Sequence, residues 1–177
     1  GNGSGGGVGL EAGGNMTLAS GAGNGTVTAD SNGSATAGAV FIQHISGATT
    51  GVIKLSNTIS AQGGTAGVAG AGSNGGAVTV WNEDGAINVD GIINVSRGST
   101  ATDGSIAMKA LGDITDTNNG SLIGDTSGTL KVWSTGGLIR LTQGATIAGV
   151  VAGNLGDGAV GHQIKTVAFE TDTTTAS

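Results

Sequence analysis

Residues 78–89, VTVWNEDGAINV, recur as residues 130–141, LKVWSTGGLIRL, at a constant offset of 52 residues. The matching positions hold aliphatic residues, tryptophan or glycine: Val78, Val80, Trp81, Gly85, Ile87 and Val89 in the first copy, and Leu130, Val132, Trp133, Gly137, Ile139 and Leu141 in the second. A weaker third copy between them contains Ile106, Met108, Lys109, Gly112 and Ile114. The repeating unit is therefore about half of 52 residues, a glycine-led pair of short strands joined by a turn. Self-similarity of this kind predicts the stacked rungs of a solenoid.

Short segments in which apolar and polar residues alternate recur between residues 15 and 149, and Gly, Asn, Asp or Ser bounds each of them. This pattern is typical of strands and turns. An antiparallel sandwich and a parallel solenoid could both be built from such strands. A parallel solenoid places equivalent residues of neighbouring rungs about 4.8 Å apart, so it predicts like residues at like offsets. The repeat therefore favours the parallel solenoid.

The composition limits both the core and the partners of the chain. It has 38 glycines in 177 residues, no Pro, Cys or Tyr, and two Trp and two Phe. So few aromatic residues suit a thin core of stacked aliphatic side chains. With six Lys and Arg and a net charge of −6, the chain has no basic patch for nucleic acid. No run of 18 apolar residues occurs, so no membrane-spanning helix is expected.

We expect residues 1–177 to form a single β-solenoid segment cut from a longer protein. Residues 1–14 are expected to be a Gly-rich entry and residues 15–149 to form the rungs, with a loop at 61–77. A second Gly-rich loop is expected at 149–162. Residues 163–177 are expected to hold a last strand and a Thr-rich tail.

The glycines are expected to form the corners of the rungs. Gly85 and Gly137 occupy the same place in the repeat, and Gly112 is the third member of the set. A rung must turn within a few residues, and a positive φ is most easily adopted by glycine. We therefore expect these corners to use positive φ.

The two tryptophans define the candidate binding surface. If Val78 and Val80 point inward, alternation turns Trp81 outward, and Lys109 and Trp133 with it. The three side chains would then form a surface column with cation–π contacts, suited to stacking on glycans or docking another rod. We favour the other interpretation, that both tryptophans lie at a corner where the alternation fails, where each only covers a loop or the edge of the core.

No catalytic residues, metal site or cofactor is predicted. His44 and His162 are far apart in the sequence and lack the spacing of metal ligands. Asp113 and Asp116 are weak candidates for calcium, because the segment matches no calcium-binding loop and Asp is an ordinary turn residue.

Several segments resemble the repeat region of filamentous-haemagglutinin-type proteins, which are bacterial exoproteins of two-partner secretion systems akin to autotransporter passengers. These segments are GGNMTLAS, GGAVTVWNEDGAINVDGIINVS, TDGSIAMKALGDI and GGLIRLTQGATIAG. The resemblance implies a right-handed parallel β-helix, which here would have about six or seven rungs. It also implies secretion through an outer-membrane pore and a role in adhesion, biofilm or a fibrous surface layer.

We therefore expect a structural or adhesive module of a secreted bacterial surface fibre or adhesin, located outside the cell or on its surface. Its expected partners are other copies or adjacent repeats of the same protein, which would associate end to end, and host or matrix glycans. The alternative function is a β-helix that binds or cleaves polysaccharide, of the lyase or tailspike type. A cluster of Asp, Glu and Arg on one outer face would distinguish the enzyme, and the sequence does not obviously supply one.

Overall fold

The computed structural model describes ten parts of the chain, and for residues 121–123, 128 and 164–171 it describes the backbone alone. These parts are residues 5–19, 21, 26–31, 35–47, 50–64, 73–98, 101–116, 121–123, 128–140 and 164–171. Within them the regular secondary structure is entirely β-strand, with no helix. No helix in this part of the chain is therefore long and apolar enough to span a bilayer.

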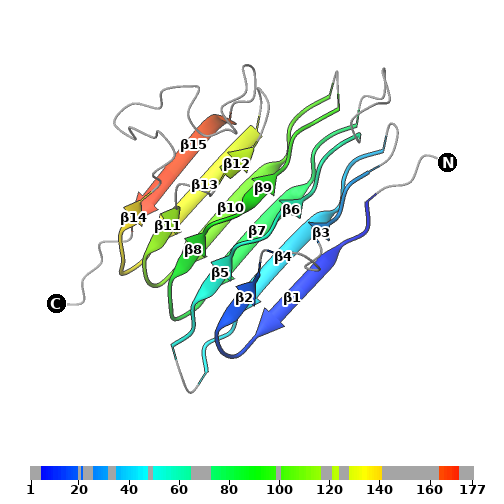
Figure 1. Cartoon of the computed structure of the whole chain (residues 1–177). Coiled ribbons are helices and arrows are strands. Elements are labelled where there is room, and N and C mark those ends of the chain that lie inside the picture. The colour runs from blue at the N-terminus through cyan, green and yellow to red at the C-terminus, as the bar shows by residue number, and fades with distance from the viewer. Residues whose placement is uncertain are drawn as a thin grey trace.

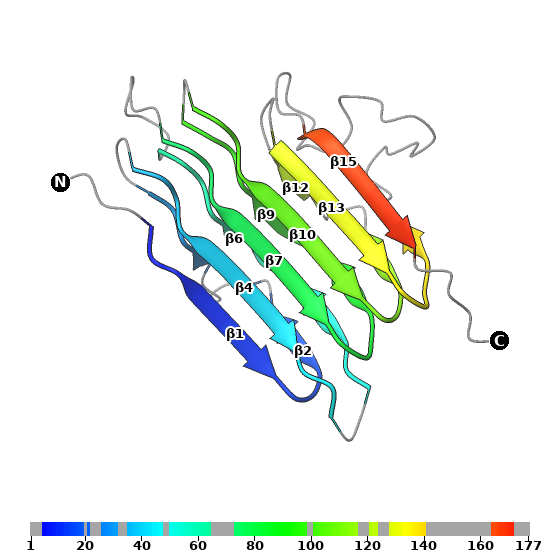
Figure 2. The ribbon, with the colours of Figure 1, turned by 180° about the vertical axis from the view of Figure 1, so that it is seen from behind.

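The strands form three parallel sheets, which we call A, B and C (Figures 1 and 2). Sheet A has six strands: β1 (Val8–Ala12), β4 (Ala39–His44), β7 (Ala77–Asn82), β10 (Ser105–Ala110), β13 (Gly128–Ser134) and β15 (Ile164–Thr171). Sheet B has five strands: β2 (Met16–Leu18), β5 (Ile53–Leu55), β8 (Ile87–Val89), β11 (Ile114–Asp116) and β14 (Ile139–Arg140). Sheet C has four strands: β3 (Val27–Thr28), β6 (Ile59–Ser60), β9 (Ile92–Asn94) and β12 (Ser121–Ile123).

From β1 to β14 the chain visits the sheets in the order A, B, C, and we call three successive strands in this order a pass. Each strand pairs in parallel with its equivalent in the next pass, as β7 does with β10 in sheet A and β8 with β11 in sheet B. A pass therefore contains three strands, and the predicted unit of two strands was wrong. The strands of sheet C are only two or three residues long, so the repeat alone does not distinguish them as a third strand of the unit.

The register predicted from the 52-residue repeat is confirmed by the pairing of β7, β10 and β13. Ile106 pairs with Val78 on one side and with Leu130 on the other. Met108 lies in the same way between Val80 and Val132. The weaker third copy of the repeat therefore contains β10, the strand that lies between β7 and β13.

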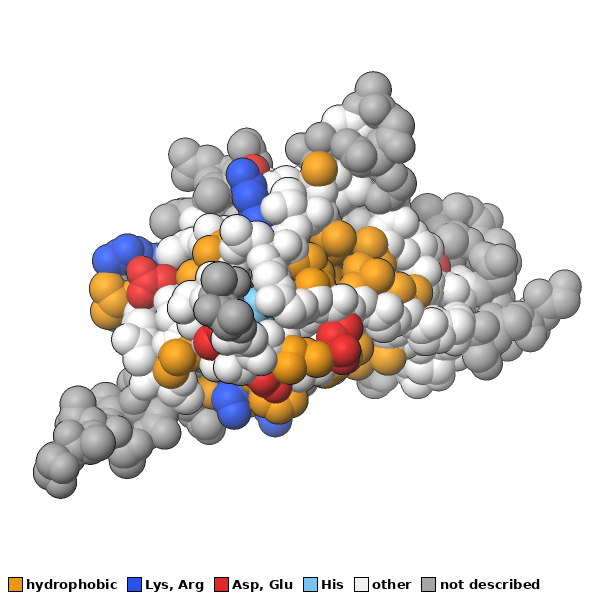
Figure 3. All heavy atoms as spheres, turned by 90° about the horizontal axis from the view of Figure 1, so that it is seen from below, with side chains coloured by type: hydrophobic (Ala, Val, Ile, Leu, Met, Phe, Trp, Pro, Cys, Tyr) orange, Lys and Arg blue, Asp and Glu red, His pale blue; other side chains and the backbone are white. Residues whose placement is uncertain are grey.

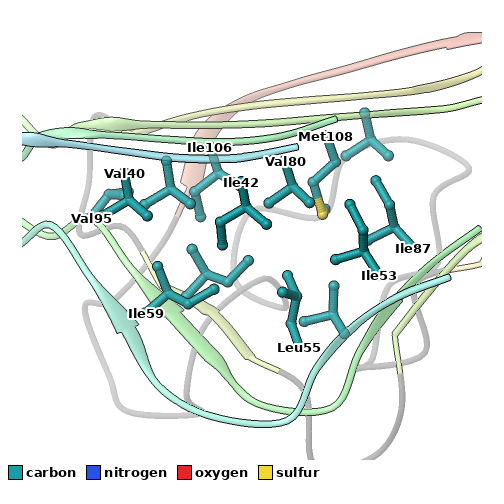
Figure 4. Packing of buried hydrophobic residues seen from close by; sticks show 14 of the residues in the cluster. Val40, Ile42, Ile53, Leu55, Ile59, Val80, Ile87, Val95, Ile106 and Met108 are labelled. Atoms are coloured by element: carbon teal, nitrogen blue, oxygen red, sulfur yellow. The ribbon is translucent and has the colours of Figure 1, made fainter. Parts of the chain in front are cut away.

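The core consists of aliphatic side chains from all three sheets (Figure 4). Alternation decides which residues enter it: in β7, Val78, Val80 and Asn82 are buried while the residues between them are partly exposed. Ile53, Ile87 and Ile59 enter the same cluster from sheets B and C. The described core contains no aromatic side chain, as expected for a thin space between sheets.

The expected division of the chain differs from the structure at its start. Residues 8–12 of the predicted Gly-rich entry form β1, which pairs with β4 along its full length. Glycine content concealed this strand, because the segment GGGVGLEAGG still alternates at Val8, Leu10 and Ala12. The predicted loop at 149–162 lies outside the described residues, and of the loop at 61–77 the middle, 65–72, does too.

Candidate functional site: an aromatic strip on sheet A

Trp81, Lys109 and Trp133 lie side by side on the outer face of sheet A, and we call them the Trp–Lys–Trp strip. Lys109 pairs with Trp81 in β7 and with Trp133 in β13. Each is flanked along its own strand by buried residues, so all three side chains point away from the core. The alternation therefore holds at both tryptophans, which do not lie at corners where it fails.

The lysine holds the strip together. Its ammonium nitrogen lies 5.5 Å from the ring centroid of Trp81 and 5.9 Å from that of Trp133. Both distances fall within the range of a cation–π contact, worth about 0.5–1 kcal/mol at an exposed site. In the register of the sheet Lys109 occupies the position between the two tryptophans.

A hollow of about 240 Å³ opens beside the strip. It is lined by Thr79, Val80, Trp81, Ala107, Lys109 and Trp133. Ala107 lies between Thr79 and Lys131 in the neighbouring outward column, and its short side chain leaves space beside the strip. The hollow thus has an apolar floor, aromatic walls and a cation at its edge.

The neighbours of the strip were not among the residues predicted for the site. Thr79, Ala107, Lys131 and the exposed Phe41 all point outward from sheet A, one column away from the tryptophans. The same alternation that turned Trp81 outward could have placed them, since each lies two residues before a strip position or its equivalent in β4. Lys131 and Phe41 extend the surface that the strip begins.

The three glycine corners lie where the chain passes from sheet A to sheet B. A Cβ at Gly85 would overlap the carbonyl oxygen of Gly51, its counterpart in the preceding pass. A Cβ at Gly137 would likewise overlap the backbone of Gly112 and Asp113. The expected positive φ was wrong, because in the described residues it occurs only at Gly21 and Gly64. Close approach of one pass to the next, and not an unusual backbone angle, requires glycine here.

Buried polar groups fasten the same corner. The Nδ2 group of Asn82 donates to the carbonyls of Gly51 (2.9 Å) and Ala86 (2.8 Å), and its Oδ1 accepts from the amide of Gly85 (2.9 Å). Ser134, in the same inward column, accepts from the amide of Gly137 and donates to the carbonyl of Gly112, both at 2.8 Å. His44 occupies the same inward column one pass before Asn82, and its Nδ1 lies 3.1 Å from Oδ1 of Asp84. These residues hold the corner and do not face the strip.

The weak calcium candidates are not brought together into a ligand set. Asp113 lies at a corner, where it accepts a hydrogen bond from the amide of Leu138 (2.8 Å) and faces Arg140 at 3.9 Å. Asp116 is the last residue of β11, and it is buried. In the part of the chain that the structure describes, no cluster of three or more His, Cys, Asp or Glu residues could hold a metal ion.

The resemblance to filamentous-haemagglutinin-type repeats rests on the quoted segments alone. The strip and its hollow, in contrast, are defined by strand pairing and side-chain contacts. Comparison of the chain with protein family models, with curated proteins and with solved structures found no match.

Proposed function

We propose that this chain is a structural and adhesive module of a secreted bacterial surface fibre, built as a right-handed parallel β-helix of about six rungs. The cyclic order of the sheets and the parallel pairing of each strand with its equivalent in the next pass support the β-helix. The right-handed form follows the general preference of parallel crossover connections. Secretion and location outside the cell are parts of the same proposal and rest on the resemblance.

The observation that carries the adhesive function is the placement of the aromatic residues. The chain has two Trp and two Phe, and three of these four point outward from sheet A. Aromatic side chains supply most energy when they are buried, in a core or at an interface. Their concentration on one outer face supports the assignment of that face as a contact surface.

A stack of paired strands is also a suitable support for such a surface. Each strand of sheet A between β1 and β15 has a partner on both sides, which fixes the spacing of outward side chains along the stack. The strip therefore presents its rings at a set separation, with little conformational entropy left to lose on binding. Polysaccharide, which offers repeated sugar rings with apolar C–H faces, is the partner that best matches such an array.

Adhesion can be tested with beads coated with the purified chain. We expect the beads to be retained on at least one surface from a panel of cellulose, chitin, polygalacturonate and hyaluronan. The double variant Trp81→Ala and Trp133→Ala should lose this retention, because both walls of the hollow are removed. Leu138→Ala is the matched control, since it removes an exposed apolar side chain just before sheet B.

The proposal would be contradicted by either of two results. One is the absence of retention on every surface of the panel. The other is retention that is the same for the wild type and the double tryptophan variant when circular dichroism shows that both are folded.

A further inference from the structure

The hollow beside the strip has the size and lining of a site for a sugar ring. Its volume of about 240 Å³ is of the order of a single pyranose with some solvent. Pyranose rings present C–H groups on their faces, and these pack against aromatic rings, while their hydroxyls remain at the edges. Trp81 and Trp133 supply the aromatic surfaces, and the hydroxyl of Thr79 is a polar group at the rim.

The three strands that carry the strip present positive charge outward, although the whole chain is negative. The outward residues of β7, β10 and β13 include two lysines, Lys109 and Lys131, and no carboxylate, while Glu11 and Glu170 occupy the same register column on the edge strands β1 and β15. The chain as a whole carries a net charge of −6. Among the described side chains, neither lysine has a carboxylate within ion-pair distance. The nearest acid along the chain from the strip, Glu83, already accepts hydrogen bonds from Gln43 and Ser46.

The three residues of the strip follow one another across the strands of sheet A, in the direction in which the strands are stacked. Trp81 and Trp133 lie two strands apart in the same sheet, which is about 9.6 Å at the usual strand spacing of about 4.8 Å. One residue of a 1,4-linked pyranose chain advances by nearly the spacing of one strand. A polysaccharide lying across the strands would therefore bring alternate rings to the two tryptophans, with Lys109 beside the ring between them.

We infer that the Trp–Lys–Trp strip binds an acidic polysaccharide, whose pyranose rings carry carboxylates, along the stacking direction of sheet A. This inference rests on the proposed adhesive function and names the class of its ligand. The rings stack on Trp81 and Trp133, and a ring carboxylate accepts hydrogen bonds from the ammonium of Lys109. Lys131, one column away, adds a second positive charge to the same path.

The inference can be tested by titrating the intrinsic tryptophan fluorescence with oligogalacturonate and with its methyl ester. The two probes share the same sugar ring and linkage, and the methyl group of the ester removes the negative charge. At low salt, the acid should bind about tenfold more tightly than the ester, as one charge-assisted hydrogen bond allows. Affinity should also rise with the length of the oligomer until both tryptophans are spanned.

The variants separate charge from stacking. Lys109→Met keeps an unbranched stem between the rings, so it should abolish the preference for the acid while the ester still binds. Lys54→Met is the matched control, since Lys54 is exposed on sheet B, and it should bind both probes as the wild type does. Circular dichroism of each variant reports whether the fold is kept.

Equal affinity for the acid and the ester would overturn the inference, and so would a Lys109→Met variant that still prefers the acid. Either result, combined with bead retention that depends on the tryptophans, would leave the adhesive function standing and remove only the acidic ligand. Failure of the adhesive function itself would appear separately, as the absence of tryptophan-dependent retention on every surface.

Discussion

The short distance between neighbouring passes of the chain requires glycine at position 85. A Cβ there would overlap the carbonyl oxygen of Gly51. Asn82 then uses its side chain to satisfy that same carbonyl and the amide of Gly85. Gly85 and Asn82 act together. The absence of a side chain at Gly85 lets two passes approach, and the side-chain amide of Asn82 forms hydrogen bonds with the backbone of both passes.

Replacing Gly85 by alanine should lower the free energy of unfolding by about 1–3 kcal/mol, the usual cost of overpacking a site that cannot expand. Urea denaturation of the wild type and the variant measures the difference. Gly9→Ala is the control, because Gly9 lies on the outer face of β1 with no atom within 4 Å of its Cβ position. That control should be neutral or stabilising by about 0.4–1 kcal/mol. Equal destabilisation by both changes would show that close approach does not explain Gly85.

At the scale of the strand, the contribution of an inward side chain to the free energy of unfolding depends on whether a neighbouring strand packs on one side of it or on both. Leu10 and Met108 occupy the same inward column of sheet A, which runs through Ile42, Val80 and Val132. Met108 is fully buried between two strands, whereas Leu10 on the edge strand β1 is only partly buried. The middle of the sheet is therefore expected to be more sensitive to substitution than its edge.

Met108→Ala should cost about 2–5 kcal/mol, the range for removing a large apolar side chain from a core. Leu10→Ala should cost less than half as much, because fewer contacts are lost. Thermal or urea unfolding of the two variants at low protein concentration makes the comparison. A cost at Leu10 as large as that at Met108 would mean that β1 is covered as fully as β10.

The strands of sheet A could be predicted from the sequence where the alternation is long. The six-residue strands β7 and β10 and the seven-residue β13 carry the 52-residue match, which also fixed their register and the column of Trp81, Lys109 and Trp133. β12 could not be predicted, because a strand of three residues contains too little alternation to recognise.

The hollow could not be predicted either. It depends on which residues stand in the column next to the tryptophans, and the passes of this chain differ in length. Val40, Val78, Ile106 and Leu130 are equivalent in sheet A, yet they are separated by 38, 28 and 24 residues. No fixed period links such positions across the whole sheet. The weaker copy of the repeat does align Ala107 with Thr79 and Lys131, but the open space beside them depends on side-chain conformations that a sequence pattern does not specify.

At the scale of the molecule, the end formed by the first pass is apolar. β1, β2 and β3 are the edge strands of sheets A, B and C, and among the described residues no strand pairs with their free sides. Val8, Leu10, Met16, Leu18 and Val27 are only partly buried there. The view from below in Figure 3 includes hydrophobic side chains that remain uncovered in the middle of the molecule. Unpaired strand edges beside apolar side chains favour the addition of further strands, as the proposed end-to-end association requires.

The weight-average mass of the purified chain, measured by sedimentation equilibrium, should therefore increase with concentration. Leu10→Lys should reduce this increase, because a charge in β1 opposes the docking of another apolar end. Lys54→Met, on the outer face of sheet B, should leave it unchanged. A wild-type chain that keeps the mass of one copy up to the highest soluble concentration would contradict end-to-end association.

The central claim is that the outer face of sheet A, through Trp81, Lys109 and Trp133, is the adhesive surface. The chain contains only two tryptophans, and both belong to the strip, so a ¹H–¹⁵N spectrum reports on it through two indole N–H signals. During titration with soluble oligosaccharides cut from the panel of polysaccharides, both signals should shift together and saturate at the same concentration. Two indole signals that stay in place while the beads still adhere would contradict the claim.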